Sequence, residues 1–229
     1  MRHLLYVPII HGEADMGSAG RELSQKSAEL LGQSRWLLHQ KMVCMFWNSL
    51  TAFLLSLDPS LLRVYQDGLA TDGRVGRRIV EEAAARGSQN YQLILQLLDR
   101  GAEIRKTENP SLLLREHSSL RSSLLGESEG QEQLTADLYL EKIYGLTKDR
   151  DSYIARSIGD TLKEGELGVL FIGAHHDVAS LLPTDILVRM VKDTEKVRAY
   201  FVELTQGQDG KRLEELAAYL ASPVEQLPN

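Results

Sequence analysis

Histidines and carboxylates follow directly after four apolar runs of this sequence. His11 and Glu13 come after the first run, Asp67 after the second, Glu108 after the third and His176 after the fourth. Imidazole nitrogens and carboxylate oxygens bind divalent transition metals such as Mn, Co, Ni and Zn. A metal with open coordination positions makes hydroxide from water near neutral pH. The same side chains can also act without a metal, as general acid and base.

Each of these carboxylates has a simpler interpretation as a helix cap. Glu13 and Asp15, Glu108 or Asn109, and Asp177 all stand where a following helix could begin and where they could cap it. For any single carboxylate, capping is the favoured interpretation. Histidines at two strand ends add little as caps, so we favour a shared site for His11 and His176. These two are the predicted metal ligands, with Glu13 or Glu108 as the accompanying carboxylate.

The elements that must position these residues alternate along the chain. Apolar runs predict strands at residues 4–10, 61–65, 102–107, 167–173 and 197–204. Helical spacing predicts helices up to residue 57 with a break near Gly32, and at 90–100, 110–125, 134–143, 151–163, 186–192 and 212–220. Strands separated by helices imply crossover connections. We therefore expect a single α/β domain over residues 1–222, with a mostly parallel sheet of about five strands flanked by helices, and a tail at 223–229. In such sheets ligands bind outside the carboxyl ends of the strands.

Composition narrows the class of partner. The 229 residues carry a formal net charge of −6, a field that repels nucleic acid and anionic membranes. The apolar stretch at 36–57 is interrupted by polar residues, and the first apolar run is too short for a signal peptide. Cys44, the single cysteine, lies in an apolar helical pattern and is expected to be a buried, inert thiol. These features favour a cytoplasmic protein acting on a small molecule or peptide, with no nucleic-acid or membrane partner.

One stretch of the C-terminal half resembles a known motif. Asp149, Arg150 and Asp151 open a predicted helix, and the strand after it ends in Gly173-Ala174-His175-His176. This is similar to the closing signature of the TraB/Tiki group, which belongs to a wider set including erythromycin esterase-like and ChaN-like proteins. The resemblance implies an α/β fold whose site uses both motif histidines, the arginine and acidic residues. The chain departs from the pattern in having Pro8 where the first motif has glycine, and Gln66-Asp67 where the middle strand usually ends in glutamate.

The resemblance also shapes the expected chemistry. It implies metal-dependent peptidase activity through the Tiki members and esterase activity through the erythromycin esterases, whereas TraB members are described as regulatory. The leading hypothesis is a metal-assisted hydrolase of peptide, amide or ester bonds, with Glu13, Asp67, Glu108 and Arg150 as catalytic residues. A non-enzymatic regulatory or ligand-binding protein of the same fold is the alternative, and a phosphoester-processing enzyme is a third. Arg150 could be a solvated ion pair, but the resemblance favours a guanidinium in the cleft, at a helix start, that binds a carboxylate or an oxyanion.

Overall fold

A five-stranded parallel sheet forms the centre of the computed structural model, which describes residues 1–12, 20–115, 118, 136–207 and 209–224. The strand order is β3-β2-β4-β1-β5. The strands are β1 (Arg2–Ile9), β2 (Leu62–Gln66), β3 (Glu103–Arg105), β4 (Leu167–Gly173) and β5 (Ile186–Met190). The predicted α/β fold with a mostly parallel sheet is confirmed.

Strand β4 has the bounds that its sequence predicts. It lies between β1 and β2, and both of its faces are covered, so its run of apolar residues is continuous rather than alternating. Gly168 lies against side chains of β1 and of the residue that follows α6. A Cβ atom at this position would stand 2.5 Å from Leu4 Cδ1 and 3.2 Å from Leu162 Cδ2, so glycine is the residue that fits.

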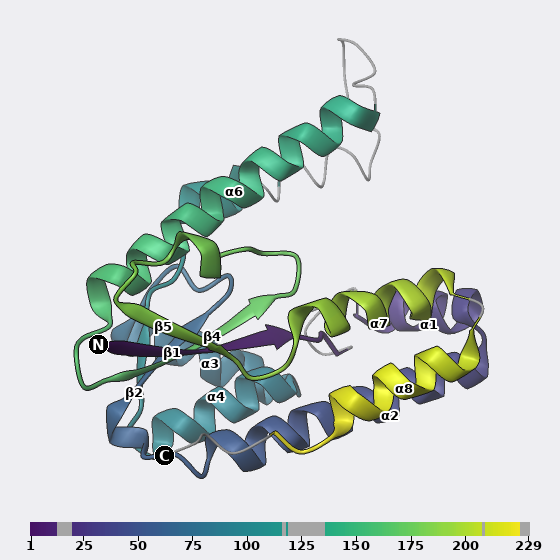
Figure 1. Cartoon of the computed structure of the whole chain (residues 1–229), viewed down its shortest axis with the longest axis horizontal. Helices are drawn as coiled ribbons and strands as arrows, with labels where there is room; N and C mark the ends of the chain where they lie inside the picture. Colours follow the sequence, from purple (N-terminus) through teal and green to yellow (C-terminus); the bar gives the residue numbers. More distant parts are fainter. Residues whose placement is uncertain (13–19, 116–117, 119–135, 208, 225–229) are drawn as a thin grey trace.

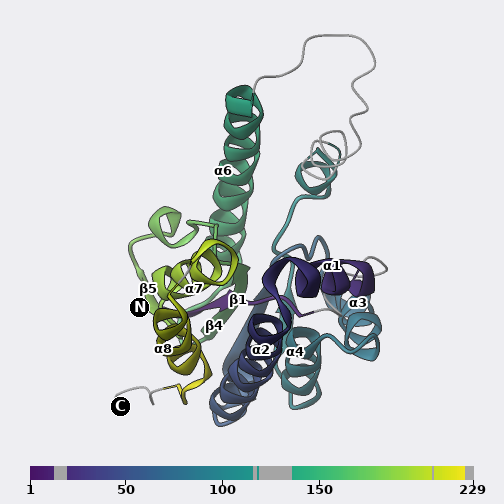
Figure 2. The same cartoon turned by 90° about the vertical axis from the view of Figure 1, so that its right-hand side faces the viewer.

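Helices cover both faces of the sheet. They are α1 (Gly20–Leu31), α2 (Gln33–Leu54), α3 (Gly73–Ala85), α4 (Gln89–Asp99), α6 (Ala136–Thr161), α7 (Thr194–Gln206) and α8 (Gly210–Ala221), with short 3-10 turns at Pro59–Leu61 and Ala179–Leu181. Figures 1 and 2 show α6 on one side of the sheet and α2, α4 and α8 on the other. Side chains of β1 alternate between the two layers: Leu4 and Tyr6 pack with α6, and Leu5 and Val7 pack with the other helices.

The predicted break near Gly32 separates α1 from α2. Gly32 has a φ of 79°, a left-handed conformation that glycine adopts without steric cost, so the first helix ends there. None of the described helices is long and apolar enough to cross a membrane.

Two predicted elements at the C-terminal end were wrong, because strand and helix were exchanged. Residues 197–204, predicted as a strand, belong to α7, and residues 186–192, predicted as a helix, contain β5. In α7 the buried residues Val197, Tyr200 and Leu204 follow helical spacing. Asp193 caps this helix by accepting hydrogen bonds from two of its backbone amides. Residues of β5 pair in parallel with β1 at the edge of the sheet, and this pairing is not visible in so short a run.

Helix α6 replaces two predicted helices. Residues 134–143 and 151–163 were expected to form separate helices, but Ala136–Thr161 is one continuous helix. Arg150 therefore lies within a helix and does not begin one, which corrects the expectation stated above. Of the helix predicted at 110–125, residues 110–115 and 118 are helical and the others lie outside the described residues, as do residues 225–229 of the predicted tail.

Several side chains of α2 and α3 differ in their exposure to solvent. Cys44, expected to be buried, is exposed on α2. His39, also on α2, is 8% exposed and lies with its Nδ1 atom 3.1 Å from the hydroxyl of Tyr200 on α7. The arginines of α3 form ion pairs on an exposed helix face: Arg77 with Glu81 and Asp99, and Arg78 with Glu82. Both arginine side chains are thus in contact with solvent.

His39 makes the stability of this fold depend on pH. Burial lowers the pKa of His39 to about 4, whereas an unfolded histidine titrates near 6.5. As pH falls from about 6.5 to about 4, the unfolded state takes up the proton first, so the free energy of unfolding decreases. We expect a loss of at most about 3 kcal/mol from this residue. Urea unfolding at pH 7 and pH 4 should show a smaller loss in His39→Gln than in the wild type.

The control for this prediction is His3→Gln, because His3 is exposed on β1. This variant should lose as much stability between the two pH values as the wild type does. An equal loss in His39→Gln and the wild type would contradict the assignment of the pH dependence to His39.

Candidate functional site

The carboxyl ends of four strands meet at one edge of the sheet. Strand β4 pairs in parallel with β1 and β2, and β2 pairs in parallel with β3, so all four strands end on the same side of the sheet. His11, Asp67, Glu108 and His176 follow these strands and share this edge. The predicted convergence of strand ends is thus present in the structure.

Arg150 connects two of these strand ends. Its Nη2 atom donates to Asp67 Oδ1 and to Glu108 Oε1, both at 2.5 Å. Glu108 is fully buried and Arg150 is 5% exposed, so the three side chains form an ion network inside the protein. Arg150 reaches this position from the interior of α6. The helix dipole therefore adds little there, because its effect is confined to the first and last turns.

His176 is held by a second carboxylate. Its Nδ1 atom is hydrogen-bonded to Asp151 Oδ1, and Asp151 Oδ2 accepts from the backbone amide of Asp177 at 2.9 Å. The other ring nitrogen, Nε2, lies 3.7 Å from Asp67 Oδ2, and within the described part of the chain it has no hydrogen-bond partner. A carboxylate on one side of an imidazole sets its tautomer and orientation. Asp151 therefore leaves the Nε2 lone pair directed toward the cluster.

Asp151 was missed as a site residue by sequence reasoning. Asp151 is the neighbour of Arg150 in the motif quoted above, and this position is the feature of the sequence that indicates a role in the site. The helical pattern by itself predicts only that Asp151 stands at the start of a helix. Within α6 the two adjacent residues serve different partners: Arg150 binds Asp67 and Glu108, and Asp151 binds the histidine.

Gly173 lets the end of β4 approach Asp67 closely. Its backbone amide donates to Asp67 Oδ2 at 3.2 Å. A Cβ atom at this position would stand 2.9 Å from the Cε1 atom of His175, so the absence of a side chain leaves room for that ring. The rings of His175 and His176 are in contact, with their centroids 4.2 Å apart and their planes tilted by 38°. Glycine thus brings a carboxylate and two imidazoles together.

The surroundings of the two carboxylic acids, Asp67 and Glu108, shift their pKa values in opposite directions. Burial opposes ionisation of Asp67, but the positive charges of His176, when protonated, and Arg150 outweigh it and lower the pKa of Asp67. Burial raises the pKa of Glu108 despite its bond to Arg150, and Glu108 Oε2 has no hydrogen-bond partner among the residues described. Two acids with pKa values shifted in opposite directions are typical of acid–base sites. Burial of the ring and the neighbouring His176 also lower the pKa of His175 to about 4, although this residue is exposed overall.

Two of the predicted site residues are not part of this buried cluster. His11 follows β1 at the same edge, but it is exposed, whereas His176 is 1% exposed. Glu13 lies outside the described residues. Of the predicted residues, the structure brings together Asp67, Glu108, Arg150 and His176.

The cluster offers a metal ion a pair of donor atoms. The described residues contain no group of three or more His, Cys, Asp and Glu side chains that could hold a metal ion. His176 Nε2 and Asp67 Oδ2 lie 3.7 Å apart, and two ligands of one tetrahedral zinc ion lie about 3.4 Å apart. The buried Nε2 atom without a hydrogen-bond partner therefore fits a metal ligand, with Asp67 as the second.

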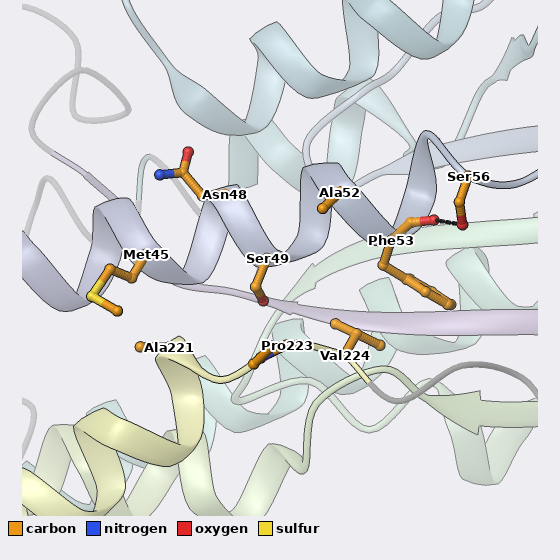
Figure 3. A pocket seen from close by; sticks show the side chains of 9 residues that line it. All are labelled: Met45, Asn48, Ser49, Ala52, Phe53, Ser56, Ala221, Pro223 and Val224. Atoms are coloured by element: carbon orange, nitrogen blue, oxygen red, sulfur yellow. Dashed lines mark hydrogen bonds between the residues drawn. The ribbon is translucent and has the colours of Figure 1, made fainter.

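Two cavities lie away from the cluster. One, of about 530 Å³, lies between α2 and the segment after α8 and is lined by Met45, Asn48, Ser49, Ala52, Phe53, Ser56, Ala221, Pro223 and Val224 (Figure 3). The other, of about 420 Å³, lies near the amino ends of β1 and β4 and is lined by His3, Leu4, Leu5, Gly165, Glu166, Leu167, Leu187 and Arg189. Neither cavity contains a residue of the cluster. Comparisons of the chain with family models, with curated proteins and with solved structures found no match.

Proposed function

We propose that this chain is a hydrolase of peptide, amide or ester bonds, with catalysis centred on His176 and assisted by a divalent metal ion. The observation that supports this proposal best is the state of the His176 imidazole. It is buried, Asp151 holds its Nδ1 side, and its Nε2 atom lies beside Asp67 without a hydrogen-bond partner in the described residues. A carboxylate behind a histidine is the usual support of a ligating or proton-accepting imidazole.

The other side chains have separate roles in this proposal. His176 Nε2 and Asp67 Oδ2 would hold a Mn, Co, Ni or Zn ion, which when bound lowers the pKa of water and so supplies hydroxide. Glu108, whose pKa is raised by burial, retains a proton more readily than an ordinary glutamate and would donate it to the leaving group. Arg150 fixes both carboxylates and places a positive charge near the oxyanion of the attacked carbonyl.

A second candidate is a non-enzymatic ligand-binding or regulatory protein of the same fold. One observation favours it: Arg150 already pairs with both Asp67 and Glu108, so these carboxylates have a cationic partner without any metal. A small molecule or peptide would then be bound without being hydrolysed.

His176→Ala separates these functions. We expect the wild type to bind one of the four ions in calorimetric titration and to hydrolyse members of an ester and peptide panel, and His176→Ala to lose both properties. Metal affinity should fall toward acid pH, because protons compete with the ion for the imidazole. The matched control is His3→Ala, an exposed histidine at the amino end of β1, which should retain both properties.

The outcomes are distinct. Ion binding that is unchanged in His176→Ala would exclude a metal at this site. A wild type that hydrolyses no substrate with any of the ions would contradict the hydrolase and favour the ligand-binding candidate.

A further inference from the structure

Three side chains of the cluster are closed off from solvent, and Asp67 is half-buried. His176 is 1% exposed, Glu108 is fully buried and Arg150 is 5% exposed. The Nε2 atom of His176 itself is buried. A substrate must contact this atom or an ion bound to it, so some group has to move before the proposed chemistry can begin.

His175 differs from His176 in its exposure to solvent and in its hydrogen bonding, the two properties that decide whether a side chain can move. It is exposed, and its ring lies against the His176 ring with the centroids 4.2 Å apart and the planes tilted by 38°. Within the described residues no hydrogen bond or ion pair holds its ring nitrogens, whereas Asp151 fixes His176. An exposed side chain without such bonds changes rotamer on the ps–ns timescale.

Gly173 places the His175 ring next to Asp67 as well as next to His176. The position of a Cβ atom on Gly173 is 2.9 Å from Cε1 and 3.1 Å from Nδ1 of His175, and 3.5 Å from Asp67 Oδ2. The His175 ring therefore lies on the same side of Gly173 as Asp67 Oδ2 and close to the His176 ring, which carries the other donor atom of the proposed metal site.

We propose that His175 is the cover of this site, and that rotation of its side chain opens the approach to His176 Nε2 and Asp67. The inference rests on the proposed function, because a cover matters only if a substrate enters. His175 is then a positioning residue that controls access of the substrate to His176 Nε2 and Asp67. The size of its ring decides this access, and its ring nitrogens take no part in the reaction. Substrates must displace the ring, so a larger group at position 175 narrows the entry and a smaller one widens it.

Hydrogen–deuterium exchange at the imidazole Cε1 position measures access to His176 without substrate or metal. We would compare His175→Ala with His175→Phe, since in both variants His176 is the one histidine of its peptide and is read without ambiguity by mass spectrometry. The exchange rates are measured at alkaline pH, where they no longer depend on the protonation state of the imidazole. Exchange at His176 should be about tenfold faster in the alanine variant than in the wild type, because no ring at position 175 has to rotate away first. The phenylalanine variant should match the wild type, in which fragmentation separates the two histidines.

The buried His39 is the internal control, and its exchange should be the same in all three proteins. Equal His176 exchange rates in the alanine and phenylalanine variants would overturn the proposal. Faster exchange in the alanine variant of a protein that hydrolyses nothing would support the cover and contradict the hydrolase. Equal rates in a protein that hydrolyses its substrate would contradict the cover alone.

Discussion

Replacing Arg150 by alanine is expected to lower the free energy of unfolding by about 3–5 kcal/mol. The guanidinium is the shared partner of Asp67 and Glu108, and its removal leaves two carboxylates facing each other inside the protein. Breaking a buried ion network by removing one partner costs far more than the pair itself contributes, because the remaining charges lose their solvation without compensation. Urea unfolding at neutral pH measures this loss.

Two further variants test the reason for the loss. Arg77→Ala removes an arginine that also contacts two carboxylates, Glu81 and Asp99, but on the exposed face of α3. Because water screens that network, its loss should cost no more than about 1 kcal/mol. Adding Glu108→Gln to Arg150→Ala should recover part of the stability, since one buried charge is then absent. A cost for Arg150→Ala as small as that for Arg77→Ala would contradict the buried network.

Arg150→Lys should retain the fold and lose function. A lysine supplies the charge, but it lacks the planar guanidinium that reaches two carboxylates from one side chain.

Asp151→Asn is expected to lower the rate of hydrolysis by about 10²- to 10⁴-fold. With an amide at this position, the side-chain oxygen can still accept from the Asp177 amide, so the nitrogen faces His176 Nδ1. The imidazole must then accept at Nδ1 and carry its proton on Nε2. The lone pair that the proposed chemistry needs is lost, although the ring remains in place.

The tautomer can be observed apart from the activity. Nitrogen chemical shifts of His176 should report a proton on Nδ1 in the wild type and on Nε2 in Asp151→Asn. The matched control is Asp177→Asn, because Asp177 is the exposed neighbour whose side chain bonds to Ser180. It should retain both the rate and the tautomer. A changed tautomer with an unchanged rate would show that His176 Nε2 takes no part in the reaction.

The local pattern of the chain was enough to predict a parallel sheet, four of its five strands and the sheet edge at which the cluster lies. The apolar run of β4 between two glycines is continuous because the strand is covered on both faces, and its bounds were predicted correctly. Gly32 marked the break between α1 and α2. The carboxyl ends of parallel strands meet at one edge of a sheet, so the sequence alone predicts that Asp67, Glu108 and His176 lie at the same edge.

Periodicity failed where the run was short or its partner was distant. Residues 186–190 form an edge strand through pairing with β1, whereas residues 197–204 carry the helical spacing of α7. In five to eight residues, apolar content alone does not distinguish these structures.

Only the tertiary structure decided which side chains bind one another. Arg150 and Asp67 are separated by 83 positions, and His176 and Asp151 by 25, so no local pattern links them. The buried state of Glu108 and the different exposure of His175 and His176 arise only in the folded chain. A sequence shows which groups are available at a sheet edge. Desolvation and pairing decide which of them share a proton or a charge, and both arise when distant segments pack together.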